Sequence, residues 1–179
     1  LIDARRYRAL LDRLETLLPQ MYLQVTSESA GLYKAAEQQA MVRELKPKFI
    51  SVALREMVRA ADDWSTASEF YRWAADNGVQ IQHILYAPEE LQSFLDAIEA
   101  GRISGSHHLL LFVLGSYDGS KKSEPAQVAV FSQMLATAAA SIGFDWMLCA
   151  FGKEEIDCLL EAIRLGGKAR IGFENSFHN

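Results

Sequence analysis

The sequence lacks the features of an exported, membrane-bound or nucleic-acid-binding protein. Its two cysteines among 179 residues are too few for a disulfide framework, and a reduced compartment is the simplest interpretation. No apolar run is long enough to span a bilayer, and no signal-peptide pattern opens the chain. The net charge is −5 with both signs interspersed, so no basic stripe is available for a nucleic-acid backbone. We therefore expect a cytoplasmic protein that binds neither membranes nor nucleic acids.

Half of the residues are apolar. Along the chain, their spacing switches repeatedly between the period of a helix and the period of a strand. Tyr7, Leu10, Leu11, Leu14 and Leu18 share one face of a predicted opening helix. Later helices are predicted on the faces Ala67/Phe70/Tyr71/Ala74, Leu91/Phe94/Leu95/Ile98 and Ile156/Leu159/Leu160/Ile163. The six predicted strands are Met21–Thr26, Lys48–Leu54, Val79–Tyr86, His108–Leu114, Asp145–Ala150 and Ala169–Glu174.

Boundary signals support these elements. Thr66-x-x-Glu69 fits a capping box and Pro88 fits a first helical turn, whereas Gly78, Gly101, Gly143 and Gly166 fit helix ends. Cys149 lies in a strand-like run and Cys158 in a helical one, so both thiols are expected to fill the core.

Strands separated by helices at a period of one βα unit could form either an open doubly wound sheet or a barrel. Two features favour the barrel. No glycine-rich dinucleotide fingerprint follows the first predicted strand. Polar clusters such as Thr26–Ser29 and Glu174–Ser176 follow the strands, at the edge where barrel enzymes place their chemistry.

The expected fold is therefore an α/β protein of the (β/α)8 TIM-barrel type, in one domain over residues 1–179. The sequence begins Leu-Ile-Asp-Ala without an initiator methionine and stops just after a strand-like run. We expect it to lack the first two strands and the last helix of the barrel, and so to be incomplete at both ends.

Four segments together resemble the β-keto acid cleavage enzymes, a family once known only as a domain of unknown function. The segments are Leu23–Ser29, Leu45–Pro47, Phe112–Gly115 and Gly166–Ser176. The last is the most specific, because it sets glycines, an arginine and a carboxylate over eleven positions.

The resemblance implies a metal-dependent barrel enzyme. Members of the family condense a β-keto acid with acetyl-CoA, then release acetoacetate and a new acyl-CoA by a retro-Claisen step, and they form homo-oligomers. Their divalent metal, usually zinc, is held by a His-x-His pair and by the glutamate of an Arg-x-Gly-x-Glu motif. By this resemblance Glu174 is a metal ligand, Arg170 supports the catalytic centre, and the histidine pair would lie upstream of Leu1.

The sequence also departs from the family pattern. The residue after the metal-binding glutamate is commonly an aspartate, the proposed base, whereas this chain has Asn175. An amide cannot take a proton at neutral pH, although it can orient a substrate oxygen or a water. Ala53 stands where many members have asparagine, and the segment Gln82–Ile84 corresponds to glutamate-bearing segments of relatives. These differences indicate a divergent subgroup.

The remaining candidates surround the predicted mouth of the barrel. Thr26 and Ser27 could bind the keto acid's carboxylate, although serine and threonine also serve in caps and turns. Ser51 and Tyr86 are candidate pocket residues. Lys153, before a predicted helix, is a weak candidate for the phosphates of coenzyme A.

Each site residue also has a structural interpretation. Glu174 could pair with Arg170, since four-residue spacing on a strand puts both side chains on one face. Arg55 and Glu56 fit a solvated pair, and His83 fits a core histidine.

Two other functions stay open at this point. One is a metal-dependent barrel aldolase or hydrolase without coenzyme A. The other is a barrel that has lost its chemistry and binds small acids, which Asn175 and Ala53 bring into consideration. An intact His-x-His pair upstream would favour an enzyme, and acetoacetate release would separate the cleavage enzyme from the first alternative.

Overall fold

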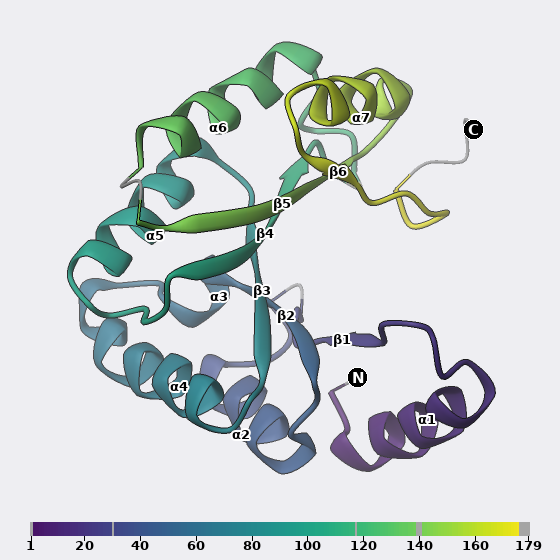
Figure 1. Ribbon diagram of the computed structural model, residues 1–179, viewed down its shortest axis with the longest axis vertical. Coiled ribbons are helices and arrows are strands. Elements are labelled where there is room, and N and C mark those ends of the chain that lie inside the picture. Colours follow the sequence, from purple (N-terminus) through teal and green to yellow (C-terminus); the bar gives the residue numbers. More distant parts are fainter. Residues whose placement is uncertain (1, 30, 117, 139–140, 176–179) are drawn as a thin grey trace. The chain divides into compact units, whose positions relative to one another are not determined.

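The computed structural model describes residues 2–29, 31–116, 118–138 and 141–175. Along this part of the chain, helices and strands alternate (Figure 1). The strands are hydrogen-bonded in chain order, β1-β2-β3-β4-β5-β6, in one sheet. An open doubly wound sheet would reverse its order at a switch point, so this order is that of a (β/α)8 barrel with part of its strands present.

The chain divides into two compact units. Unit 1 comprises residues 1–83 and 100–104, and unit 2 comprises residues 84–99 and 105–179. Strand β3 (Gln80–Leu85) contributes to both, because His83 belongs to unit 1 and Ile84 to unit 2.

Unit 1 is built on two parallel strands, β1 (Gln24–Thr26) and β2 (Phe49–Ala53). Its helical elements are α1 (Ala4–Leu17), α2 (Ala35–Leu45), the short α3 (Leu54–Met57), the 3-10 turn η1 (Ala61–Asp63) and α4 (Trp64–Asp76). The predicted α4 face is confirmed, since all four of its members are buried.

Two local expectations in unit 1 are wrong. Thr66 does not cap a helix, because α4 already begins at Trp64 and the Thr66 hydroxyl donates to the Asp63 carbonyl. The opening helix buries only part of its predicted face: Leu11 is buried, whereas Leu10 is 51% exposed.

Unit 2 is built on β4 (His107–Leu114) and β5 (Gly143–Ala150), which pair in parallel along their whole length. Its helices are α5 (Pro88–Glu99), α6 (Pro125–Thr137) and α7 (Glu155–Arg164). Phe112 of β4 stacks on Phe131 of α6 with 4.3 Å between ring centroids. This contact joins the sheet to its covering helix, and the non-alternating apolar run 109–114 is the buried parallel strand that its composition predicts.

The last strand is shorter than predicted. Strand β6 covers only Lys168–Ala169, paired with Met147 and Leu148 of β5. Arg170 makes one further hydrogen bond, from its N–H to the Leu148 carbonyl at 2.8 Å, and the chain then turns at residues 173–175. Within the described residues, β6 has a single neighbouring strand. Residues 170–174 would therefore gain few backbone hydrogen bonds by continuing the strand.

Two further expectations in unit 2 are corrected. Gly143 begins β5 and does not end a helix, since α6 already ends at Thr137. Helix α7 buries Cys158, Leu159 and Ala162, whereas the predicted core residues Ile156, Leu160 and Ile163 are exposed. The smaller side chains of Cys158 and Ala162 are the ones turned into the core.

Gly167 supports the turn before β6 by close packing. A Cβ at this position would overlap the ring of buried Trp146, although the backbone of Gly167 is not left-handed. We predict that Gly167→Ala lowers the free energy of unfolding by about 1–3 kcal/mol, as overpacking does. Urea denaturation measures this change.

Gly172→Ala is the matched control for that substitution. Gly172 lies in the same segment, its backbone is not left-handed, and nothing lies within 4 Å of an added Cβ. Equal stability of the two variants would show that the Trp146 contact does not limit residue 167.

Candidate functional site

Side chains alternate along β1 and its continuation. Gln24, Thr26 and Glu28 are exposed, whereas Val25, Ser27 and Ser29 are buried. This two-residue period is that of an extended chain, which directs successive side chains to opposite faces. Gln24, Thr26 and Glu28 therefore lie on the same, polar face of the strand and its continuation.

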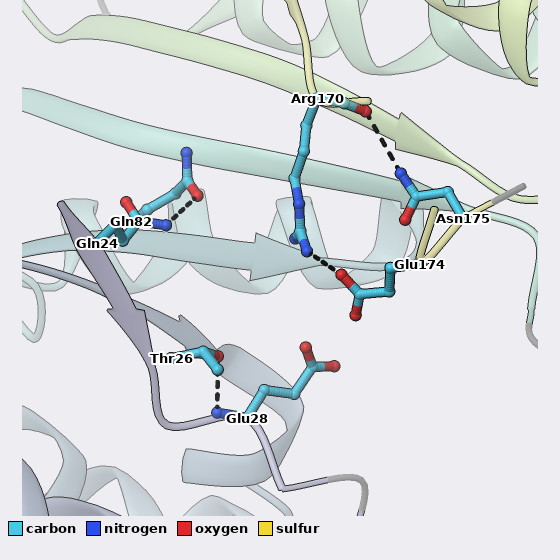
Figure 2. Close-up of polar contacts among 7 residues, drawn as sticks. All are labelled: Gln24, Thr26, Glu28, Gln82, Arg170, Glu174 and Asn175. Carbon is cyan, nitrogen blue, oxygen red and sulfur yellow. Dashed lines mark hydrogen bonds and ion pairs between the residues drawn. The ribbon is translucent and has the colours of Figure 1, made fainter. Parts of the chain in front are cut away.

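Neighbouring strands add to this face. The register pairs Thr26 with Ser51 of β2, so the two hydroxyls stand on the same face. Gln24 Nε2 donates to Gln82 Oε1 of β3 at 2.9 Å, and the Glu28 N–H donates to Thr26 Oγ1 at 3.1 Å (Figure 2). We call Gln24, Thr26, Glu28, Ser51 and Gln82 the polar face.

Ser27 lies behind the polar face. Its side chain is fully buried, and both its N–H and its hydroxyl donate to the Ser51 carbonyl, at 3.1 Å and 3.3 Å. These bonds extend the pairing of β1 with β2 by one residue. Of the two adjacent candidates, Thr26 is the one whose side chain is exposed to a ligand.

Glu56 is a candidate whose buried role the sequence did not reveal. It is only 7% exposed and does not form the solvated pair that its position beside Arg55 indicated. Its carboxylate accepts hydrogen bonds from Ser29, Gly31 and Gln38. No local signal marks it, because a glutamate just after a strand is usually solvated.

The Arg170–Glu174 motif lies in unit 2, in the turn that follows β6. Arg170 donates to the Glu174 carboxylate at 2.6 Å (Figure 2). The two side chains are 37% and 52% exposed, so the pair is open to solvent on the Glu174 side and partly covered on the Arg170 side. The two residues do meet, although on a turn and not on one face of a strand.

Asn175 holds this turn in place. It is buried, its side-chain N–H lies 3.5 Å from the Arg170 carbonyl, and its backbone N–H donates to Gly172. Its carbonyl accepts from the Gly152 N–H, which connects the turn to the segment after β5. Its Oδ1 is buried with no hydrogen-bond partner among the described residues.

Two further candidates follow strands of unit 2. Tyr86 comes directly after β3, is partly buried, and donates its backbone N–H to Glu90 at 2.9 Å. Lys153 is exposed and pairs with Glu154, the residue that precedes α7, at 3.4 Å.

The protonation behaviour of two other residues bears on their roles. Burial raises the pKa of the Cys158 thiol to about 11, with a further contribution from the negative charge of Asp157. The thiol is therefore protonated at neutral pH, which fits core filling and not nucleophilic chemistry. Hydrogen bonds from Ser116 and Ser120 lower the pKa of Asp118 to about 2, so this carboxylate stays ionised to a lower pH than an ordinary aspartate.

His83 is the core histidine that its strand position predicts. It is 4% exposed, and its ring centroid lies 5.3 Å from that of Tyr71. In the described part of the chain, no three His, Cys, Asp or Glu side chains are grouped so that they could hold a metal. Glu174 would need further ligands from outside those residues to form such a site.

None of the described helices is both long and apolar enough to traverse a bilayer. The strand order and the position of the polar groups after the strands are those of a (β/α)8-barrel enzyme. A family model described as beta-keto acid cleavage enzyme matches residues 2–179, and the chain belongs to this family.

A solved structure supports the fold. A type I 3-dehydroquinate dehydratase from Clostridium difficile, solved with covalently modified comenic acid, aligns with a TM-score of 0.64 and 13% identity. The alignment covers 95% of this chain and 67% of the dehydratase chain. A protein assigned as an orotidine 5'-phosphate decarboxylase from Streptomyces avermitilis gives a TM-score of 0.46 and 12% identity, covering 90% of this chain and 59% of its own. None of the curated proteins matches the sequence.

The exposure of the Arg170–Glu174 pair leads to a stability prediction. Ion pairs open to solvent contribute little, so Glu174→Ala should change the free energy of unfolding by less than about 1 kcal/mol. Urea denaturation of the variant beside the parent protein measures this. A loss above about 2 kcal/mol would instead mean that Glu174 holds the turn together.

Proposed function

We propose that this protein is a metal-dependent β-keto acid cleavage enzyme. It condenses a β-keto acid with acetyl-CoA and releases acetoacetate and a new acyl-CoA by a retro-Claisen step. One observation carries the proposal: the family match extends over residues 2–179, including the motif in which Arg170 and Glu174 contact each other. The proposal places the enzyme in the cytoplasm as a homo-oligomer.

Glu174 is the proposed metal ligand in this chain. Its carboxylate is half exposed and its partner is a partly exposed arginine, so it can reach a cation without leaving a buried charge behind. An oxygen donor of this kind fits a zinc site completed by histidines. When bound, such a metal polarises a carbonyl oxygen and so favours loss of the adjacent proton.

Arg170 of unit 2 and the polar face of unit 1 are each proposed, independently, as binding groups for oxygens of the keto acid. The planar guanidinium of Arg170 can bind a carboxylate through two parallel hydrogen bonds. The Thr26 hydroxyl is on an exposed side chain, so it suits the acid or keto oxygens. Ser51 shares its face but is only 4% exposed, and it is proposed to line the pocket behind Thr26. Ser27 supports Thr26 through the strand pairing, and Tyr86 is proposed as a wall residue.

Asn175 is proposed to orient the centre and not to act as its base. An amide does not accept a proton at neutral pH. Its contacts to Arg170 and Gly172 hold the turn that carries the motif. Lys153 is proposed for the phosphates of coenzyme A, near the first turn of α7, where backbone N–H groups favour anions.

The metal assignment gives the first functional test. The protein with its natural termini should contain about one zinc ion per chain, as expected for a single structural or catalytic site. Glu174→Ala should lose that metal while staying folded. Elemental analysis of the purified proteins measures the content.

Glu161→Ala provides the control for metal binding. Glu161 also forms an ion pair with an arginine, Arg164, at 2.5 Å, but it belongs to α7 and not to the motif. This variant should retain the metal. Full zinc content in Glu174→Ala would contradict the ligand assignment.

The substrate assignment gives the second test. Thr26→Val preserves the side-chain shape but removes the hydroxyl, so kcat/KM for a β-keto acid with acetyl-CoA should fall about 10–100-fold, as for a lost hydrogen bond to a charged group. Acetoacetate release across a panel of β-keto acids measures the activity.

Thr16→Val, on exposed α1, is the matched control and should leave the activity unchanged. If the parent protein releases acetoacetate from no β-keto acid in the panel, the cleavage function is refuted. If Thr26→Val retains full activity, only the role of Thr26 fails.

A further inference from the structure

A buried carboxylate lies behind the polar face without contributing a side chain to it. Glu56, on α3, receives the Ser29 N–H at 3.3 Å and 3.1 Å, the Ser29 hydroxyl at 3.1 Å and the Gly31 N–H at 3.3 Å. Gln38 Nε2, from α2, donates to Glu56 Oε2 at 2.9 Å. Two helices thus converge on the chain just after β1.

The energetics make this arrangement specific. A carboxylate taken out of water is costly unless hydrogen bonds replace its hydration. Ser29 and Gln38 are buried, so their donors would be left unsatisfied if the carboxylate were removed, whereas Gly31 is exposed. Ser29 is therefore held to Glu56 as strictly as Glu56 is held to Ser29.

The extended chain transmits this restraint to the opposite face. Ser29 and Ser27 point inward, so Glu28 and Thr26 between and beside them must point outward. The Glu28 N–H also donates to Thr26 Oγ1, which directs one lone pair of that hydroxyl. Fixing Ser29 at Glu56 therefore limits how Thr26 and Glu28 can turn.

We propose that Glu56 is a positioning residue, which sets the direction of Thr26 and Glu28 toward the substrate without touching it. The inference rests on the proposed function for the identity of that substrate. It assigns a role to a residue at which neither composition nor spacing indicates one, and it makes α2 and α3 part of the binding apparatus.

Two substitutions of Glu56 by side chains of nearly the same size separate the effect of its hydrogen-bond acceptors from the effect of its volume. Glu56→Leu removes every acceptor, so the amide hydrogens of Ser29 and Gly31 should exchange at least about tenfold faster. Glu56→Gln keeps one oxygen, and rotation of the Gln38 amide can satisfy the new side-chain N–H. This variant should therefore stay close to the parent protein.

Substrate affinity distinguishes a positioning role from a purely structural one, because a purely structural residue would leave that affinity unchanged. Acetoacetate is the probe, with its dissociation constant measured by calorimetry, and KM and kcat are measured for the best β-keto acid. In Glu56→Leu we expect acetoacetate binding to weaken and KM to rise by about tenfold, with a smaller change in kcat. Glu56→Gln should restore most of both.

Glu44→Leu is the matched control, since Glu44 is exposed on α2 and takes no part in these bonds. Hydrogen exchange is read site by site, so a general loss of stability would show itself in the amides of β2 as well. Faster exchange confined to Ser29 and Gly31, together with the rise in KM, would support the proposal.

Two results would overturn it, and both differ from a failure of the proposed function. Unchanged exchange in Glu56→Leu would refute the restraint itself. Faster exchange with unchanged acetoacetate affinity and KM would reduce Glu56 to a scaffold residue. If the parent protein neither binds acetoacetate nor releases it, the proposed function fails, and with it the link between this loop and a substrate.

Discussion

The register of β1 against β2 determines which side chains of unit 1 can meet a ligand. It pairs Thr26 with Ser51 and leaves the Ser51 carbonyl to accept both donors of Ser27. A shift of one residue would turn Thr26 inward and Ser27 outward, exchanging the exposed hydroxyl for the buried one. Every role proposed for the polar face depends on this register.

The two groups of candidate residues are stabilised in different ways. Around Glu56, a carboxylate is buried among neutral donors, and the cost of leaving the buried donors of Ser29 and Gln38 unsatisfied keeps the chain at Ser29 in one conformation. Around Glu174, the ion pair is partly exposed and weak, while backbone contacts of Asn175 hold the turn. A carboxylate that must bind a metal ion is better placed in a setting like that of Glu174 than in one like that of Glu56. Glu174 can exchange its arginine for the metal at a small cost in free energy.

Much of the fold follows from local patterns. The apolar run 109–114, the face Ala67/Phe70/Tyr71/Ala74 and the helix start at Pro88 all appear where period and boundary residues predict them. The final strand does not, since residues 170–174 are β-like in composition yet have little to pair with. Helix α7 also differs, because its apolar residues cover more than one face and packing decided which face is buried.

The sequence by itself determined the period of helices and strands, the family, and the pairing of an arginine with a glutamate four residues later, because each depends on residues close together in the chain. Tertiary structure alone decided that Ser27 is enclosed while Thr26 is open, and that Glu56 receives donors from Ser29, Gly31 and Gln38. Those outcomes depend on which segments distant in the sequence come together, and the free energy of burying a polar group is set by the partners that arrive there.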